Sequence, residues 1–154
     1  MPPTATIAYL DCFAGISGDM MLAALIDAGL PPDVLRQGVG QLGLGPVALD
    51  IETTRQHGLH AVRVKVSGGS DQPLRTLADL LAILHRSGLA AEITAPADRV
   101  VRLLAEAEAR VHGVAVDEVH FHEVGAVDSI LDIVGAAVGL IYFGVDAVYA
   151  SALP

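Results

Sequence analysis

The sequence of 154 residues contains one cysteine, no tryptophan and few aromatic residues, and each scarcity is informative. The single cysteine, Cys12, excludes an intrachain disulfide and fits a reducing compartment. Because aromatic residues make up only 4% of a chain that is 53% hydrophobic, the interior must be built from Ala, Val, Leu and Ile. Such a composition is usual for helices packed on a sheet, and the length suffices for one domain.

Basic residues are also scarce, with nine Lys and Arg against eighteen Asp and Glu, and the formal net charge is −9. An acidic surface repels phosphate backbones, so we expect no nucleic-acid binding; it is compatible with a cationic ligand. Long hydrophobic runs are absent as well. The longest, 133–145, has 13 residues and follows Asp132, whereas a membrane span needs roughly 20. With no signal peptide at the N-terminus, these features predict a cytoplasmic protein without a membrane partner.

Hydrophobic periodicity predicts a mixed α/β (α+β) domain over 1–154, with a small mixed sheet of about four strands covered by helices. The first strand is expected to be buried. In the helix 96–112, an apolar stripe is expected to face the core, formed by Val100, Leu103, Leu104, Ala107 and Val111. The expected strands are 5–11, 47–53, 59–66 and 146–150, and the expected helices are 19–28, 33–42, 76–86, 96–112 and 128–143.

The first candidate site is the segment 11–19, Asp-Cys-Phe-Ala-Gly-Ile-Ser-Gly-Asp, between the first expected strand and helix. Gly15 and Gly18 let backbone N–H groups face a ligand, and the following helix N-terminus favours an anionic group beside Ser17. Asp11, at the strand end, is placed to hold a metal or a hydroxyl. The alternative interpretation, which the spacing supports equally well, is that Ser17 or Asp19 only caps the helix and the glycines only turn the chain. A Walker A loop is excluded because the Gly-Lys-Ser/Thr ending is absent.

The second candidate site is the segment 119–129, Val-His-Phe-His-Glu-Val-Gly-Ala-Val-Asp-Ser. In an extended chain His120 and His122 point to the same side, so both imidazoles can reach one cation. Glu123 points the other way unless the chain bends, which Gly125 permits. Two imidazoles with carboxylate oxygens suit nickel or zinc better than magnesium.

Two aspartates follow the histidines on the last long helix. Asp128 and Asp132 are one helical turn apart on one face. Asp132 lies inside an otherwise apolar helix, where a buried carboxylate needs a partner. The alternative interpretation is that the histidine pair is plain surface and Asp128 only an N-cap. Two histidines and three acids within 120–132 favour a metal site over that alternative.

These motifs, in this order and spacing, resemble those of the LarC family of nickel-insertion proteins, and the resemblance covers essentially the whole chain. The matching segments are Asp-Cys-Phe-Ala-Gly-Ile-Ser-Gly-Asp-Met-Met-Leu at 11–22, Leu-Ala-Glu-Ala-Glu-Ala-Arg-Val-His-Gly at 104–113, and Val-His-Phe-His-Glu-Val-Gly-Ala-Val-Asp-Ser-Ile at 119–130, continuing to Asp132-Ile133-Val134-Gly135.

The resemblance implies that the chain is the N-terminal domain of a longer nickel chelatase or cyclometallase of the lyase class. Such proteins insert nickel into pyridinium-3,5-bisthiocarboxylic acid mononucleotide and give the nickel-pincer nucleotide cofactor. They consume CTP with manganese or magnesium, which the resemblance assigns to a C-terminal domain absent here. Partners would be that mononucleotide, the rest of the chain and other cofactor-biosynthesis proteins, and a homo-oligomer is compatible.

The residues and the resemblance together suggest roles for both candidate sites. His120 and His122, with Glu123 or Asp128, would hold nickel, and the loop of Gly15, Ser17 and Gly18 would hold the phosphate of the mononucleotide. One of Asp11, Asp19 and Asp132 would accept the ring proton lost when the nickel–carbon bond forms. The histidine-rich stretch that the family often carries is replaced by Ser-Gly-Gly-Ser-Asp-Gln-Pro at 67–73.

Two other functions use the same residues. A metal-dependent phosphohydrolase would turn over a phosphate ester with magnesium or zinc alone. A non-catalytic module would bind nickel or the nucleotide and present it to the missing domain, in which case the isolated chain is inactive. Turnover by the isolated chain separates the two.

Overall fold

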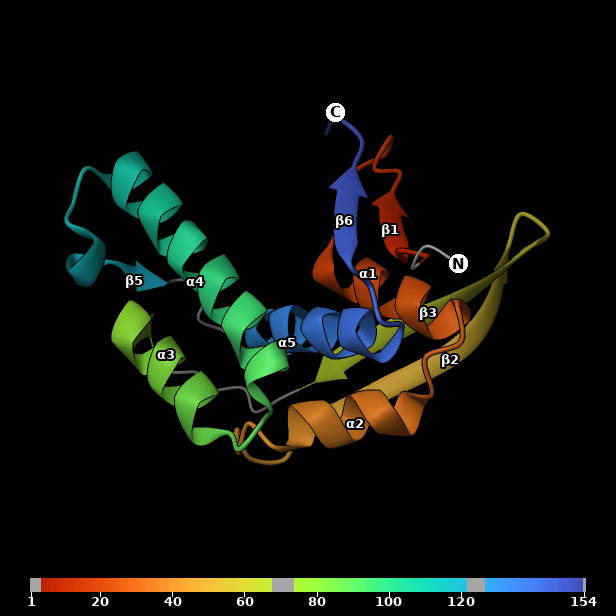
Figure 1. The fold of residues 1–154 in the computed structure, drawn as a ribbon, viewed down its shortest axis with the longest axis horizontal. Coiled ribbons are helices and arrows are strands. Elements are labelled where there is room, and N and C mark those ends of the chain that lie inside the picture. Colours follow the sequence, from red (N-terminus) through yellow and green to blue (C-terminus); the bar gives the residue numbers. More distant parts are fainter. Residues whose placement is uncertain (1–3, 68–73, 122–126, 154) are drawn as a thin grey trace.

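A computed structural model describes residues 4–67, 74–121 and 127–153 and shows a mixed α/β fold, which confirms the predicted class. The helices pack against one another, a long hairpin extends to one side of them, and a pair of strands projects from them (Figure 1). The α-helices are α1 (Gly18–Asp27), α2 (Pro32–Gly40), α3 (Leu77–Arg86), α4 (Ala91–His112) and α5 (Val127–Tyr142), with a 3-10 turn η1 (Val116–Glu118). The strands are β1 (Ile7–Leu10), β2 (Ala48–Gln56), β3 (Leu59–Ser67), β4 (Arg75–Thr76), β5 (His120–Phe121) and β6 (Ala147–Ala150).

The described strands form three separate two-stranded sheets and not one sheet of about four strands. Strands β2 and β3 make an antiparallel hairpin that lies against α1, so its long strands never reach the other pairs (Figure 1). Strands β1 and β6 pair in parallel, and β4 and β5 pair in antiparallel. β4 and β5 have two residues each, too few to show the alternation by which sequence reveals a strand.

The centre of the molecule is the contact between α1 and α5. Gly135 and Gly139 of α5 lie against the ends of Leu22 and Leu25 of α1, and a Cβ at Gly135 would come within 2.7 Å of Leu22 Cδ2. Because residues later in α1 meet residues later in α5, the two helices run parallel. Their N-termini therefore lie at the same end of the contact.

Helix α4 buries a different face from the one that the sequence predicts. Its buried residues are Ala97, Val101, Ala105 and Ala109, a row of small side chains at a spacing of four that lets α3 and α5 approach closely. Three members of the expected core stripe are exposed instead, namely Val100, Leu103 and Val111. The helix also begins before Pro96, at Ala91, and Ile93 in its added first turn packs against the core.

Strand β1 is exposed and not buried as predicted, since Ile7 and Tyr9 are more than half accessible. Cys12, just after it, is buried, and its thiol lies 3.6 Å from the Leu10 carbonyl oxygen. Among the helices of the described ranges, none is both long and apolar enough to cross a membrane.

Candidate functional site

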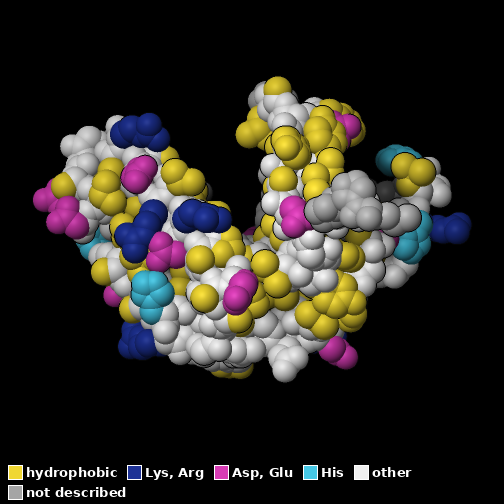
Figure 2. Space-filling view, in the orientation of Figure 1, with side chains coloured by type: hydrophobic (Ala, Val, Ile, Leu, Met, Phe, Trp, Pro, Cys, Tyr) yellow, Lys and Arg dark blue, Asp and Glu magenta, His cyan; other side chains and the backbone are white. Residues whose placement is uncertain are grey.

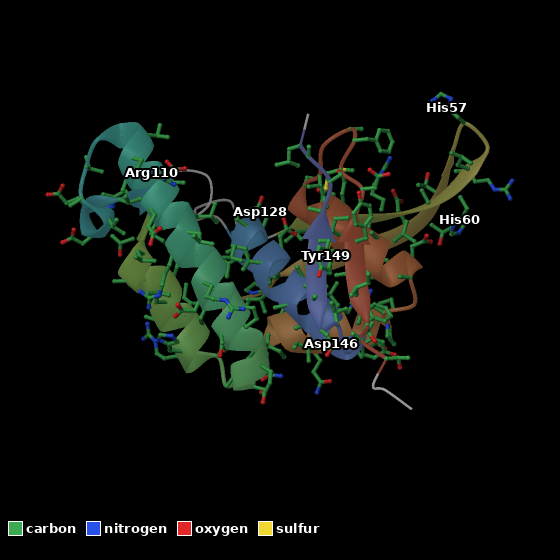
Figure 3. All side chains as sticks on the ribbon, turned by 45° about the horizontal axis from the view of Figure 1, so that its top comes forward. His57, His60, Arg110, Asp128, Asp146 and Tyr149 are labelled. Carbon is green, nitrogen blue, oxygen red and sulfur yellow. The ribbon has the colours of Figure 1, made fainter. Side chains whose placement is uncertain are left out.

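The paired N-termini of α1 and α5 open onto a small acidic depression. Its volume is about 240 Å³, and strand β3 forms its other wall. Asp128, labelled in Figure 3, lies at the start of α5, on the side of that helix where α1 begins. The lining residues are Ser17, Gly18, Asp19, Val64, Lys65, Val66, Asp128 and Asp132.

Ser17 and Asp19 form a local pair at the start of α1. Ser17 occupies the N-cap position, but its side chain does not cap the backbone. Its hydroxyl donates instead to the Asp19 carboxylate, which also accepts from the Met20 N–H at 3.0 Å. Ser17 therefore does not cap the helix through its side chain, whereas the Asp19 carboxylate accepts a hydrogen bond from a backbone N–H of the first turn, as the alternative interpretation allowed.

Asp132 is the most perturbed acid of the site. It is only partly accessible, and its Oδ1 is buried with no hydrogen-bond partner among the residues that the structure describes. Burial, and after it the negative charges of Asp19 and Asp128, together raise the pKa of Asp132 to about 6. This carboxyl group can therefore exchange a proton near neutral pH.

Gly18 explains how Asp132 is confined. A Cβ at position 18 would overlap the Asp132 side chain, so only glycine lets α1 approach α5 this closely. The first expected site and the last expected helix thus meet at one point, although 114 positions separate these two residues. This contact joins two of the predicted functional segments into one site.

Positive charge partly offsets the three carboxylates. Lys65 lines the same depression from β3. The N-termini of α1 and α5 also carry partial positive charge, which stabilises carboxylates within the first turn. The arrangement still leaves more negative than positive charge, and it suits a cation that brings its own ligands.

The remaining residues of the glycine loop lie before the depression. Gly15 has a φ of 85° and donates from its N–H to the Cys12 carbonyl oxygen at 2.9 Å, which closes a tight turn that glycine favours. Gly15 and Asp11 do not line the depression. Of the three predicted proton acceptors, the structure brings Asp19 and Asp132 together and leaves the exposed Asp11 outside.

The histidine segment is only partly described. His120 lies on β5 opposite Thr76, with its side chain exposed, whereas His122 and Glu123 lie outside the described residues. His120 borders a mainly apolar hollow of about 300 Å³ with His112 and Glu118. His120 also contributes to lowering the pKa of Asp79, after the larger effect of hydrogen bonds from Thr76.

His120 and Asp128 therefore border different hollows in this structure. Over residues 4–67, 74–121 and 127–153, no three His, Cys, Asp or Glu side chains are grouped closely enough to hold a metal ion. The residues that separate His120 from Asp128 in the chain include His122 and Glu123, two of the four predicted ligands.

Sequence reasoning missed Lys65, a basic side chain that lines the depression. The alternation of β3 does place Lys65 on the polar face of the hairpin. Nothing in that pattern indicates that this part of the hairpin crosses in front of α1 and α5.

The fold and the site thus define a small α/β domain that gathers three carboxylates at the N-termini of α1 and α5, with Asp132 the most confined of them. Residues 8–154 match the model of a family described as "Nickel insertion protein". The chain belongs to the nickel insertion protein family.

Curated relatives agree with this assignment. The chain is 52% identical over 149 residues to a protein of Geobacter sp. (strain M21) named "Putative nickel insertion protein", covering 96% of this chain and 39% of that protein. Proteins of the same name from Geotalea daltonii and Roseiflexus castenholzii are 50% and 47% identical, each with 96% of this chain and 38% of the relative covered. The chain therefore spans about two fifths of these relatives' length. No solved structure matches the chain.

Proposed function

We propose that this chain is the N-terminal domain of an enzyme that inserts nickel into pyridinium-3,5-bisthiocarboxylic acid mononucleotide. The family is that of nickel insertion proteins, and the product would be the nickel-pincer nucleotide. In the complete protein the reaction would be that of a cyclometallase of the lyase class. It would consume CTP with manganese or magnesium, bound by the part that lies outside this chain.

The confinement of Asp132 is the observation that carries the proposal. Formation of a nickel–carbon bond replaces a ring C–H bond, and the proton released needs an acceptor. One oxygen of Asp132 is buried with no partner in the described part of the chain, and its pKa is raised to about 6, so its carboxylate can take up a proton near neutral pH. We therefore assign Asp132 as the base, with Asp19 and Asp128 holding its affinity for protons high.

Nickel and the pyridinium ring are both cationic, which suits the acidic depression. We propose that nickel is held by His120, His122 and Glu123 and passes to Asp128 at the edge of the depression. Asp128 is exposed. Among the described residues, it is the one of these four proposed ligands that lines the depression. Gly15, Ser17 and Gly18 would contact the phosphate, since two helix N-termini favour an anion once a cation has offset the carboxylates.

A non-catalytic module remains the second candidate for the isolated chain. In that case the site would be completed by the pincer ligand or by the rest of the protein. A phosphohydrolase is the weaker alternative.

Calorimetric titration of nickel into this chain tests the delivery step. We expect the His120→Ala/His122→Ala double variant and Asp128→Asn each to weaken nickel affinity at least tenfold. Asp33→Asn is the matched control, because Asp33 is an exposed acid at the start of another helix, outside the depression. Unchanged affinity in the two test variants would overturn the metal assignment.

Insertion itself is tested in a full-length protein, by the absorbance of the nickel–pincer product with CTP present. Asp132→Asn is expected to abolish insertion while leaving nickel affinity within about twofold of wild type. Insertion at the wild-type rate would show that another group takes the proton. Release of phosphate from the mononucleotide by this chain alone, with magnesium or zinc, would favour the hydrolase.

A further inference from the structure

The parallel strands β1 and β6 are joined at both ends by further hydrogen bonds, beyond their paired residues. At one end the Thr6 N–H donates to Asp146 Oδ2 at 2.8 Å. At the other, the Ser151 N–H donates to the Leu10 carbonyl oxygen at 2.9 Å and the Ser151 Oγ accepts from the Cys12 N–H at 2.8 Å. Four residues on each strand pair in register between these two sets of hydrogen bonds.

All eight paired residues are apolar or tyrosine, so neither face of the pair carries a charge. One face holds Ile7, Tyr9 and Tyr149, which are 59%, 63% and 58% exposed. Val148, on the opposite face, is 47% exposed. Tyr9 and Tyr149 are direct partners across the two strands. The pair therefore presents apolar side chains to solvent on both sides.

The pair also stands away from the helices that flank it in the chain. It projects beyond α1, α2 and α5 (Figure 1). Hydrophobic side chains are prominent on the projection in the face seen in Figure 2. Figure 3 labels Asp146 at the base of β6 and Tyr149 further along it. The surface is hollowed between this projection and α4, which leaves room beside the pair (Figure 2).

Strands with these properties usually lie in the interior of a larger sheet, and a separate two-stranded sheet rarely has them. Parallel strands with apolar residues on both faces occur almost only where further strands flank them and helices cover both faces. An isolated two-stranded sheet is marginal in water, and an exposed apolar edge invites pairing. In the described ranges β1 and β6 have only each other as strand neighbours.

We propose that strands of the same polypeptide, from the region that the relatives carry beyond the matched part, extend the β1–β6 pair into a larger parallel sheet. The 149 matched residues are 39% of the Geobacter sp. relative, so about three fifths of that protein is available to do this. A second copy of this chain fits less well. It would offer another edge strand, but its own α1 and α5 also lie away from its strand pair and would leave the apolar faces uncovered.

Two changes that keep the short chain folded test the proposal. Tyr9→Lys with Tyr149→Glu places opposite charges on cross-strand partners, which preserves net charge and a favourable pair. In this 154-residue chain we expect the melting temperature to move by about 2 °C or less, because both positions are exposed. In the chain joined to the remaining polypeptide of the Geobacter sp. relative, the same pair would be buried, and we expect a fall of about 5 °C or more.

Leu59→Lys with Thr53→Glu is the matched control, because it also preserves net charge and both side chains are exposed on the β2–β3 hairpin, outside the β1–β6 pair. It is expected to have an equally small effect in both lengths of chain. A long chain that tolerates the Tyr9/Tyr149 variant as well as the short one would overturn the proposal. So would a short chain that sediments as a dimer and becomes monomeric in that variant, since a second copy would then be the occupant.

Hydrogen–deuterium exchange gives a reading that needs no variant and no nickel. The strands matching β1 and β6 are expected to exchange at least tenfold more slowly in the full-length Geobacter sp. relative than in its matched 149 residues alone. Equal exchange in both would overturn the proposal. Because neither measurement involves nickel or turnover, failure here is distinct from failure of the proposed function.

Discussion

Replacing Asp132 by Asn should make the protein more stable at neutral pH, although it removes the residue proposed as the base. The pKa of Asp132 rises from 3.8 to about 6 on folding, first because of burial and then because of Asp19 and Asp128. Between these values the folded state holds a proton that the unfolded state releases. Stability contributed by this group is thus present below about pH 4 and is lost as pH rises through 6.

The size of the effect follows from the shift. A rise from 3.8 to about 6 corresponds to a penalty of about 3 kcal/mol for the ionised wild type above pH 7, as an upper bound, and roughly 1 kcal/mol at pH 4.5. Asparagine has the shape of the protonated acid and never ionises. The stability difference between variant and wild type should therefore grow by about 2 kcal/mol from pH 4.5 to 8.

Urea unfolding at both pH values measures this difference, and comparison within each pH cancels every other titrating group. Asp33→Asn removes the same charge from an exposed position and should show no such growth. If the stability difference between Asp132→Asn and wild type were the same at pH 4.5 and 8, the reasoning about burial and like charges would be refuted. Added salt should reduce only the part due to the exposed Asp19 and Asp128.

Three further outcomes are expected. Gly18→Ala should lower the free energy of unfolding by about 1–3 kcal/mol in urea titrations, because its Cβ would overlap Asp132. Gly135→Ala should lower it relative to Gly40→Ala by a similar amount, since a Cβ at Gly135 meets Leu22 whereas Gly40 faces open space. Asp98→Asn should cost at most about 1 kcal/mol at pH 7. Hydrogen bonds from Arg102 and then His85 lower the pKa of Asp98, so this stability is present above 3.8 and is lost as the pH falls through the lowered pKa; the difference between variant and wild type should therefore shrink on acidification.

The helices could be predicted from sequence because each contains its own signals. The expected helix 19–28 is observed as Gly18–Asp27, and 128–143 as Val127–Tyr142. Apolar spacing and the glycine after each helix are local features that survive folding. The pairing of strands is not local, and sequence gave no reason for β1 to pair with β6 rather than with the hairpin.

Two predictions about burial are wrong, for β1 and for one face of α4, and in both cases a surface predicted to be buried is exposed. The sequence pattern predicts a buried β1 and a core stripe of Val100, Leu103 and Val111 on α4, and the structure leaves these side chains exposed. Periodicity reports which surfaces a sequence is built to bury, not which chain or segment buries them. That both surfaces are apolar but open agrees with a protein whose relatives are much longer.

The membership of the candidate site could be predicted only in part. Ser17, Gly18, Asp19, Asp128 and Asp132 were all identified from their motifs, and they do line one depression. Their meeting could not be predicted, because it depends on the parallel contact of α1 with α5. The sequence leaves the proton acceptor open among three aspartates, and the raised pKa of the partly buried Asp132 is the reason why we propose it for that role.

The same contact that builds the core also creates the chemistry of Asp132. Leu22 and Leu25 pack onto Gly135 and Gly139, and this spacing continues by one turn to place Gly18 against Asp132. Because the helices run parallel, both N-termini arrive at this turn and stabilise the carboxylates there, which would otherwise repel the approach. Small residues along α5 therefore set the distance at which a carboxylate is confined. A change that widens the helix contact should lower the pKa of Asp132 even where it touches no ionisable group.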